Sequence, residues 1–105
     1  MKRERFLMER ANVSIADFQA FIEERYGAKD RERGVPKTFL WFMEEVGELA
    51  NALQRSEVSD EGVDLAGEFA DVLGWLTTLA NIRGIDLTEA IRETYLDSGG
   101  RNHKS

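Results

Sequence analysis

The residues with the clearest potential for chemistry are three acids in the stretch 36–55, Glu44, Glu45 and Glu48. Apolar residues recur in this stretch at the spacing of an amphipathic helix. At 100° per residue, Glu45 and Glu48 border the apolar stripe, whereas Glu44 faces more fully outward. Like charges three or four residues apart repel each other on a helix. The pattern therefore predicts a positive partner, for which a divalent cation is the simplest candidate.

A second amphipathic stretch, 61–83, carries acids at the same kind of border. Asp64, Glu68 and Asp71 follow one another at spacings of four and three. Asp64 is better explained as part of an acidic first turn, where the helix dipole favours negative charge. Packed antiparallel, the two helices can bring four carboxylates together, those of Glu45, Glu48, Glu68 and Asp71.

The ligands available at such a site are oxygen atoms only. The chain has no cysteine and a single histidine, His103, near its C-terminal end. Carboxylate oxygens suit Mg²⁺, or Mn²⁺ in its place, better than zinc or copper.

Two motifs in these stretches resemble those of the MazG-like nucleotide pyrophosphohydrolases, the all-α NTP pyrophosphatase superfamily. EExxE occupies residues 44–48 and ExxD occupies residues 68–71. The flanking sequence extends the resemblance over roughly residues 14–96. The resemblance implies Mg²⁺-dependent hydrolysis of a nucleoside triphosphate to monophosphate and pyrophosphate.

The resemblance also assigns roles to individual residues. It implies that Glu45, Glu48, Glu68 and Asp71 are metal ligands, and that Glu44 orients or deprotonates the attacking water. It further implies a homodimer or a dimer-based tetramer, with the pocket near the subunit interface.

Candidates for holding the phosphates are cationic, and each has a simpler explanation beside the functional one. Residues 27–35 are predicted to form a polar loop that begins at a helix cap, Gly27. Arg33 in this loop, and Lys37 just after it, either face phosphate or a second subunit, or form local ion pairs. Arg92 is the only cation in the last helix, where superfamily members often carry a phosphate-holding residue.

Candidates for contacting the base are aromatic or amide side chains. Trp41 is either a packing residue or a wall of the base pocket. Trp75, four residues after Asp71, either stacks on a base or packs. Asn81 bonds either the nucleotide or a backbone group.

Length and composition restrict the class of protein. The chain has 105 residues, a net charge of −6 and a sequence pI of about 4.8. An acidic surface is unsuited to general nucleic-acid binding. The sequence shows neither an apolar run of membrane-spanning length nor a signal-peptide pattern. These features predict a soluble cytoplasmic protein.

The predicted fold is all-α. Helices are expected at 15–26, 36–55, 61–83 and 87–97, with Ser14 and Asp86 as N-caps and a linker at 56–60. The predicted divisions are an N-terminal extension at 1–13, a MazG-like domain at 14–97 and a flexible tail at 98–105. Because so short a chain buries a limited core, we expect a four-helix bundle-like protomer completed by homo-oligomerisation.

The sequence thus favours an Mg²⁺-dependent nucleoside triphosphate pyrophosphohydrolase that acts on canonical or damaged nucleotides in pool house-cleaning. The alternative is a non-catalytic helical module that binds nucleotide or protein and oligomerises. Metal-dependent release of pyrophosphate distinguishes the two.

Overall fold

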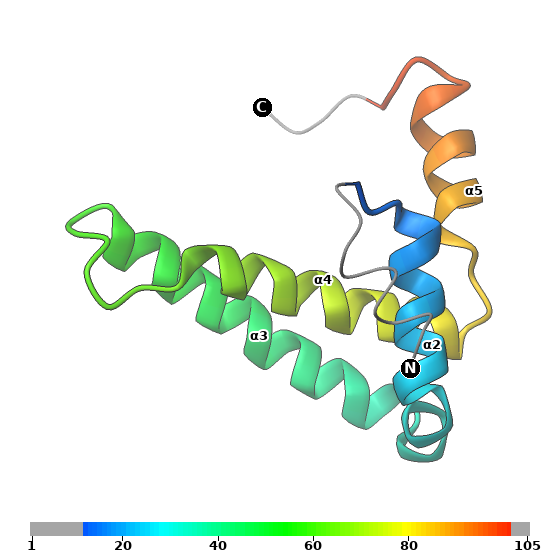
Figure 1. Cartoon of the computed structure of the whole chain (residues 1–105), viewed down its shortest axis with the longest axis horizontal. Coiled ribbons are helices and arrows are strands. Elements are labelled where there is room, and N and C mark those ends of the chain that lie inside the picture. Colours follow the sequence, from blue (N-terminus) through cyan, green and yellow to red (C-terminus); the bar gives the residue numbers. More distant parts are fainter. Residues whose placement is uncertain (1–11, 102–105) are drawn as a thin grey trace.

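The computed structural model describes residues 12–101, and these form an all-helical protomer. The helices are α2 (Ile15–Arg33), α3 (Val35–Ser56), α4 (Leu65–Ile82) and α5 (Leu87–Ile91), and α5 continues as a π-helical turn, η1 (Arg92–Leu96). Helices α3 and α4 run antiparallel as a hairpin that projects from the body formed by α2 and α5 (Figure 1). The predicted all-α, four-helix fold is confirmed.

The first helix is longer than predicted, and the predicted loop at 27–35 is wrong. Helix α2 continues through Gly27 to Arg33, and only Gly34 separates it from α3. Gly27 is buried, because the Glu23 carboxylate crosses this point of the helix to pair with Arg31 at 2.5 Å. The turn comes at Gly34, which has a φ of 84° and donates its N–H to the Asp30 carbonyl. A positive φ suits glycine, so the chain reverses one residue before the first turn of α3.

Polar side chains cap three of the helices. The Ser14 hydroxyl accepts the Asp17 N–H at 3.0 Å, and the Asp86 carboxylate accepts the Glu89 N–H at 3.2 Å. Asp64 precedes α4 and accepts the Gly67 N–H at 3.0 Å. Helix α4 therefore starts at Leu65 rather than at residue 61, and the connection from α3 is longer than the predicted 56–60 linker.

The hairpin leaves part of its apolar surface exposed to solvent. Large apolar side chains on α3 and α4 remain about half exposed: Phe39 at 49%, Met43 at 46%, Phe69 at 53%, Leu73 at 40% and Leu76 at 43%. By helical register, at about 100° per residue, each lies about 80–180° around its helix from the site acids. We call these five residues the hairpin back face.

Residues 1–11 and 102–105 are outside the part of the chain that the structure describes, so most of the predicted extension, part of the predicted tail and His103 fall outside it. Within the described part, no helix is both long and apolar enough to cross a membrane.

Candidate metal and nucleotide site

Three glutamates from the two long helices converge in space. Glu45 and Glu48 on α3 and Glu68 on α4 each place a carboxylate oxygen so that all three oxygens lie within 4.8 Å of one another. Antiparallel packing produces this meeting, because it sets the first motif beside the second (Figure 1). The structure thus places three of the four predicted metal ligands close together.

Burial and neighbouring negative charges both disfavour the ionised form of carboxyls in this cluster. Burial raises the pKa of the Glu45 carboxyl above its ordinary value, and the charges of Glu48 and Asp71 raise it further. Burial likewise raises the pKa of Glu68, again with contributions from Glu48 and Asp71. One oxygen of Glu45, Oε2, is buried and has no hydrogen-bond donor among the described residues. Such an arrangement fits a cation that would sit among the oxygens.

Asp71 stands beside the three glutamates rather than among them. Its charge acts on both Glu45 and Glu68, but its carboxylate is outside the group of mutually close oxygens. Glu44 is exposed and also lies outside this group.

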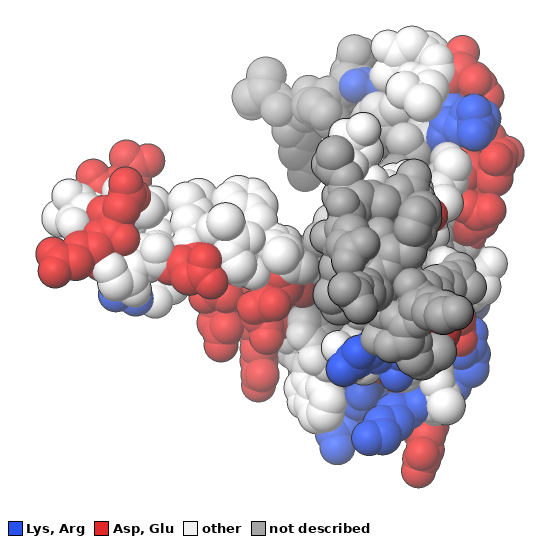
Figure 2. Space-filling model, in the orientation of Figure 1, with Lys and Arg blue, Asp and Glu red and all other residues white. Residues whose placement is uncertain are grey.

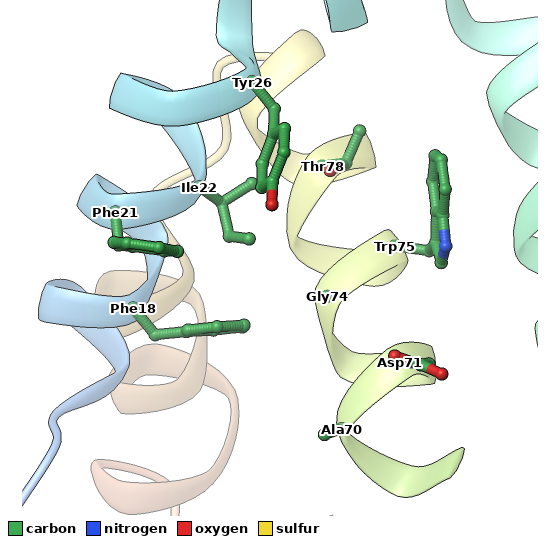
Figure 3. Close-up of a pocket in the computed structure, with 9 residues that line it drawn as sticks. All are labelled: Phe18, Phe21, Ile22, Tyr26, Ala70, Asp71, Gly74, Trp75 and Thr78. Atoms are coloured by element: carbon green, nitrogen blue, oxygen red, sulfur yellow. The ribbon is translucent and has the colours of Figure 1, made fainter. Parts of the chain in front are cut away.

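A pocket of about 450 Å³ opens between α2 and α4. Apolar and aromatic side chains of α2 point across it toward α4, whereas the side chains of Asp71 and Trp75 leave α4 on the side away from α2 (Figure 3). Gly74 leaves the α4 wall open, since an added Cβ would meet nothing within 4 Å. The complete lining is Phe18, Phe21, Ile22, Tyr26, Ala70, Asp71, Gly74, Trp75 and Thr78. Asp71 and Trp75 therefore connect an apolar pocket to the carboxylate cluster.

The two tryptophans contact each other one helical turn from the acids. The rings of Trp41 and Trp75 meet edge to face, with centroids 5.5 Å apart and planes at 84°. The Arg33 guanidinium lies 4.8 Å from the Trp41 ring centre and 5.2 Å from that of Trp75. The Lys37 ammonium lies 5.3 Å from the Trp41 ring centre. Because the rings touch, no base can insert between them, and Trp75 is the one that lines the pocket.

Arg33 is already paired within the protomer. It forms an ion pair with Asp30, and its Nε donates to the Thr38 hydroxyl at 2.9 Å. Asp30 is only 3% exposed. Sequence inspection did not single out Asp30 or Thr38, although Asp30 lies three residues before Arg33, the spacing of an ion pair on a helix.

Asn81 and Arg92 are not brought to the carboxylate cluster by any contact in the described part of the chain. The Asn81 side chain is buried, accepts a hydrogen bond from the Gln19 amide at 2.9 Å and donates to the Gln19 carbonyl at 3.3 Å. Arg92 is exposed and pairs with Glu89 at 3.4 Å. Asn81 thus serves packing between α2 and α4, and the predicted contacts of both residues with nucleotide stay predictions.

Charged side chains are grouped on the surface. Acidic side chains gather on the projecting hairpin and along α5, and basic side chains gather near the junction of α2 and α3 (Figure 2). A polyanion bound through a cation at the hairpin would have these basic groups nearby.

A family comparison agrees with this geometry. The model of the MazG nucleotide pyrophosphohydrolase domain matches residues 34–100, which include both acidic motifs and the tryptophan pair. The chain therefore belongs to the MazG nucleotide pyrophosphohydrolase family. Members of this family hydrolyse phosphoric anhydrides of nucleotides and generally depend on a divalent metal. A search among curated proteins finds no match.

Proposed function

We propose that this chain is a magnesium-dependent nucleoside triphosphate pyrophosphohydrolase that converts an NTP or dNTP and water to the monophosphate and pyrophosphate. The observation that carries the proposal is the meeting of Glu45, Glu48 and Glu68 beside Asp71 on a chain of the MazG family. A role in clearing unwanted nucleotides from the pool follows from that reaction.

Glu45, Glu48, Glu68 and Asp71 would hold the metal. Burial raises the pKa values of Glu45 and Glu68 most, and repulsion from the neighbouring carboxylates raises them further, so a cation among these oxygens would relieve an unfavourable arrangement of charge. When bound, Mg²⁺ neutralises charge on phosphate oxygens and orients the polyphosphate. Mn²⁺ would fit the same oxygen ligands.

Glu44 is our candidate for the residue that orients or deprotonates the attacking water. It lies on α3 next to Glu45 and is exposed, so it is accessible to a water and a phosphate at the cluster. A general base must come within hydrogen-bond reach of its water when substrate is bound.

The pocket between α2 and α4 is our candidate for the base. Its walls are mainly apolar and aromatic, as in most small-molecule pockets, and its volume lies in the usual range. Trp75 would form the wall nearest the acids, and Trp41 would support Trp75 from behind. The base would then lie next to Asp71, and the phosphates would point toward the cluster.

Lys37 is the best-placed candidate for contacting phosphate. It is exposed beside Trp41, and no ion pair is found for it in the described part of the chain. Arg33 is a weaker candidate, since Asp30 already balances its charge. Arg92 remains a candidate on the last helical segment.

The hairpin back face would be covered by a second copy of the chain. Its five large apolar side chains are 40–53% exposed in the single protomer, and contiguous apolar patches of this kind mark association surfaces. A homodimer, or a tetramer of two dimers, would bury it and leave the carboxylates on the outer side.

Product identity under defined metal conditions tests the function. NTPs and dNTPs would be incubated with Mg²⁺, Mn²⁺ or EDTA in ¹⁸O-labelled water, and pyrophosphate, phosphate and labelled monophosphate measured. Metal-dependent pyrophosphate release with the label in the monophosphate is expected, because water attacks the α-phosphorus. No release from any nucleotide by folded protein would overturn the proposal in favour of the non-catalytic module.

A further inference from the structure

A buried carboxylate outside the metal cluster organises the tryptophan pair. We propose that Asp30 is a positioning residue: through Arg33 it fixes Trp41 and Trp75 at the junction of the base pocket and the carboxylate cluster. The part of this inference that concerns substrate rests on the proposed function, whereas the part that concerns the indole rings does not.

The first observation is how completely Asp30 is buried. It is 3% exposed, and its Oδ1 pairs with an Arg33 side chain that is itself only 14% exposed. Its second oxygen, Oδ2, is buried without a donor among the described residues. A buried ion pair with an unsatisfied oxygen is a poor means of gaining stability, because an apolar pair of similar size often does as well or better. This cost points to a role beyond stability.

The second observation is what Arg33 touches at its other end. The guanidinium contacts both indole rings at 4.8 and 5.2 Å, and each ring comes from a different helix of the hairpin. Its Nε–H donates to Thr38, which is fully buried and donates in turn to the Gly34 carbonyl at 2.6 Å. The tight turn after α2 is thereby connected to α3 and α4. Arg33 thus has little freedom, and neither ring can turn without losing this cation–π contact.

The third observation is where the rings stand. Trp41 is four residues before Glu45, and Trp75 is four residues after Asp71, so each ring shares a helix face with one acid of the site. Trp75 also lines the base pocket. Loss of the Asp30 carboxylate would release the Arg33 guanidinium and allow Trp75 to shift at the pocket wall. Nucleotide binding would weaken, while the carboxylates would keep their places.

The experiment compares full-length wild type with Asp30→Asn and with a matched control, Glu23→Gln. The control also removes a carboxylate of α2 that pairs with an arginine, Arg31, but that pair is exposed, and the cation–π contacts of the tryptophans found in the described part of the chain come from Arg33 and Lys37. The readouts are the exciton couplet of the two indoles in circular dichroism, thermal unfolding, and KM and kcat for the best nucleotide.

For Asp30→Asn we expect a reduced exciton couplet and a KM raised about tenfold, which corresponds to about 1.4 kcal/mol of lost binding, with kcat changed less than about twofold. Glu23→Gln should match wild type in couplet and KM. A couplet and KM unchanged in folded Asp30→Asn would overturn the proposal, as would equal changes in the control.

A second variant covers the case in which Asp30→Asn does not fold. Arg33→Lys keeps the charge opposite Asp30 but removes the flat guanidinium from the rings. It should reduce the couplet and raise KM in the same way, and an unchanged couplet would overturn the proposal. If wild type hydrolyses no nucleotide, the proposed function fails, and the couplet alone decides the positioning role.

Discussion

Glu45 on α3 and Glu68 on α4 bring carboxylate oxygens within 4.8 Å of each other, and an oxygen of Glu48 lies within the same limit of both. Burial and mutual repulsion raise the pKa values of Glu45 and Glu68. Two helices that pack through apolar stripes thus hold like charges together at the edge of their interface. The energy of that repulsion is available to drive the binding of a cation.

Divalent cation should stabilise the protein through this cluster. At a concentration about 100 times Kd, binding to the folded state alone adds about 2.7 kcal/mol, or roughly 10–20 °C in Tm for a domain of this size. Thermal unfolding with Mg²⁺, Mn²⁺ and EDTA measures the shift.

Glu68→Gln should lose most of the shift, and without metal it should unfold at a slightly higher temperature than wild type because repulsion is relieved. Glu57→Gln removes an exposed acid at the end of α3 and should keep the whole shift. A shift equal in wild type and Glu68→Gln would contradict a metal site at the cluster.

The raised pKa values predict how stability depends on pH without metal. A carboxyl with a raised folded-state pKa binds more protons when folded than when unfolded, in the window between its ordinary pKa and the raised one. Its ionisation costs stability above this window, and the cost disappears as the pH falls through it. Glu45→Gln lacks this titration.

Glu45→Gln should therefore exceed wild type in stability by more at neutral pH than at mildly acidic pH. Chemical denaturation of both proteins in EDTA at several pH values measures the difference. A constant difference across the window would show that Glu45 titrates normally, contrary to its burial and its acidic neighbours.

Substitutions at Gly74 should separate stability from nucleotide binding according to the size of the new side chain. Glycine within a helix costs about 0.8–1.0 kcal/mol relative to alanine, and a Cβ at this position meets nothing within 4 Å. Gly74→Ala should thus raise Tm and alter KM little. Gly74→Leu should also fold, but its side chain would enter the pocket and raise KM about tenfold or more. Equal KM values for the two variants would indicate that the base binds elsewhere.

The hairpin back face predicts an oligomer that a single charge disrupts. Leu76→Lys places an ammonium on this face and should convert a dimer or tetramer to a 12.0 kDa monomer in sedimentation. Val58→Lys is the control, because Val58 is 90% exposed in the turn after α3, outside this face. A wild-type protein that sediments as a monomer at micromolar concentration would contradict the oligomer.

Several features could be predicted from the sequence because they depend on local spacing. The apolar periodicity predicted two long amphipathic helices that pack together, and the same spacing placed Glu45, Glu48 and Glu68 beside their apolar stripes. The N-caps Ser14 and Asp86 were predicted for a similar reason, since each capping side chain accepts a hydrogen bond from the backbone N–H only three residues further along the chain.

Other features depend on contacts that spacing does not contain. Gly27 resembled a helix end, but α2 continues through it to Gly34, and the added turns carry the ion pair of Asp30 and Arg33. Arg33, expected to be a loop cation, therefore lies on a helix, where its half-buried guanidinium packs against two indoles. For Asn81 the sequence did not distinguish a contact with nucleotide from a packing contact, because its side-chain partner, Gln19, lies 62 residues away in α2.

The most direct test of the central claim is kcat/KM for pyrophosphate release by Glu48→Gln and Asp71→Asn, beside wild type and Glu57→Gln, each with saturating Mg²⁺. We predict losses of at least about 100-fold for the two site variants, typical of removing a group that acts in the transition state, with folded spectra and an active Glu57→Gln. Activity within a few-fold of wild type in both site variants would contradict the assignment of the metal and nucleotide site to these carboxylates.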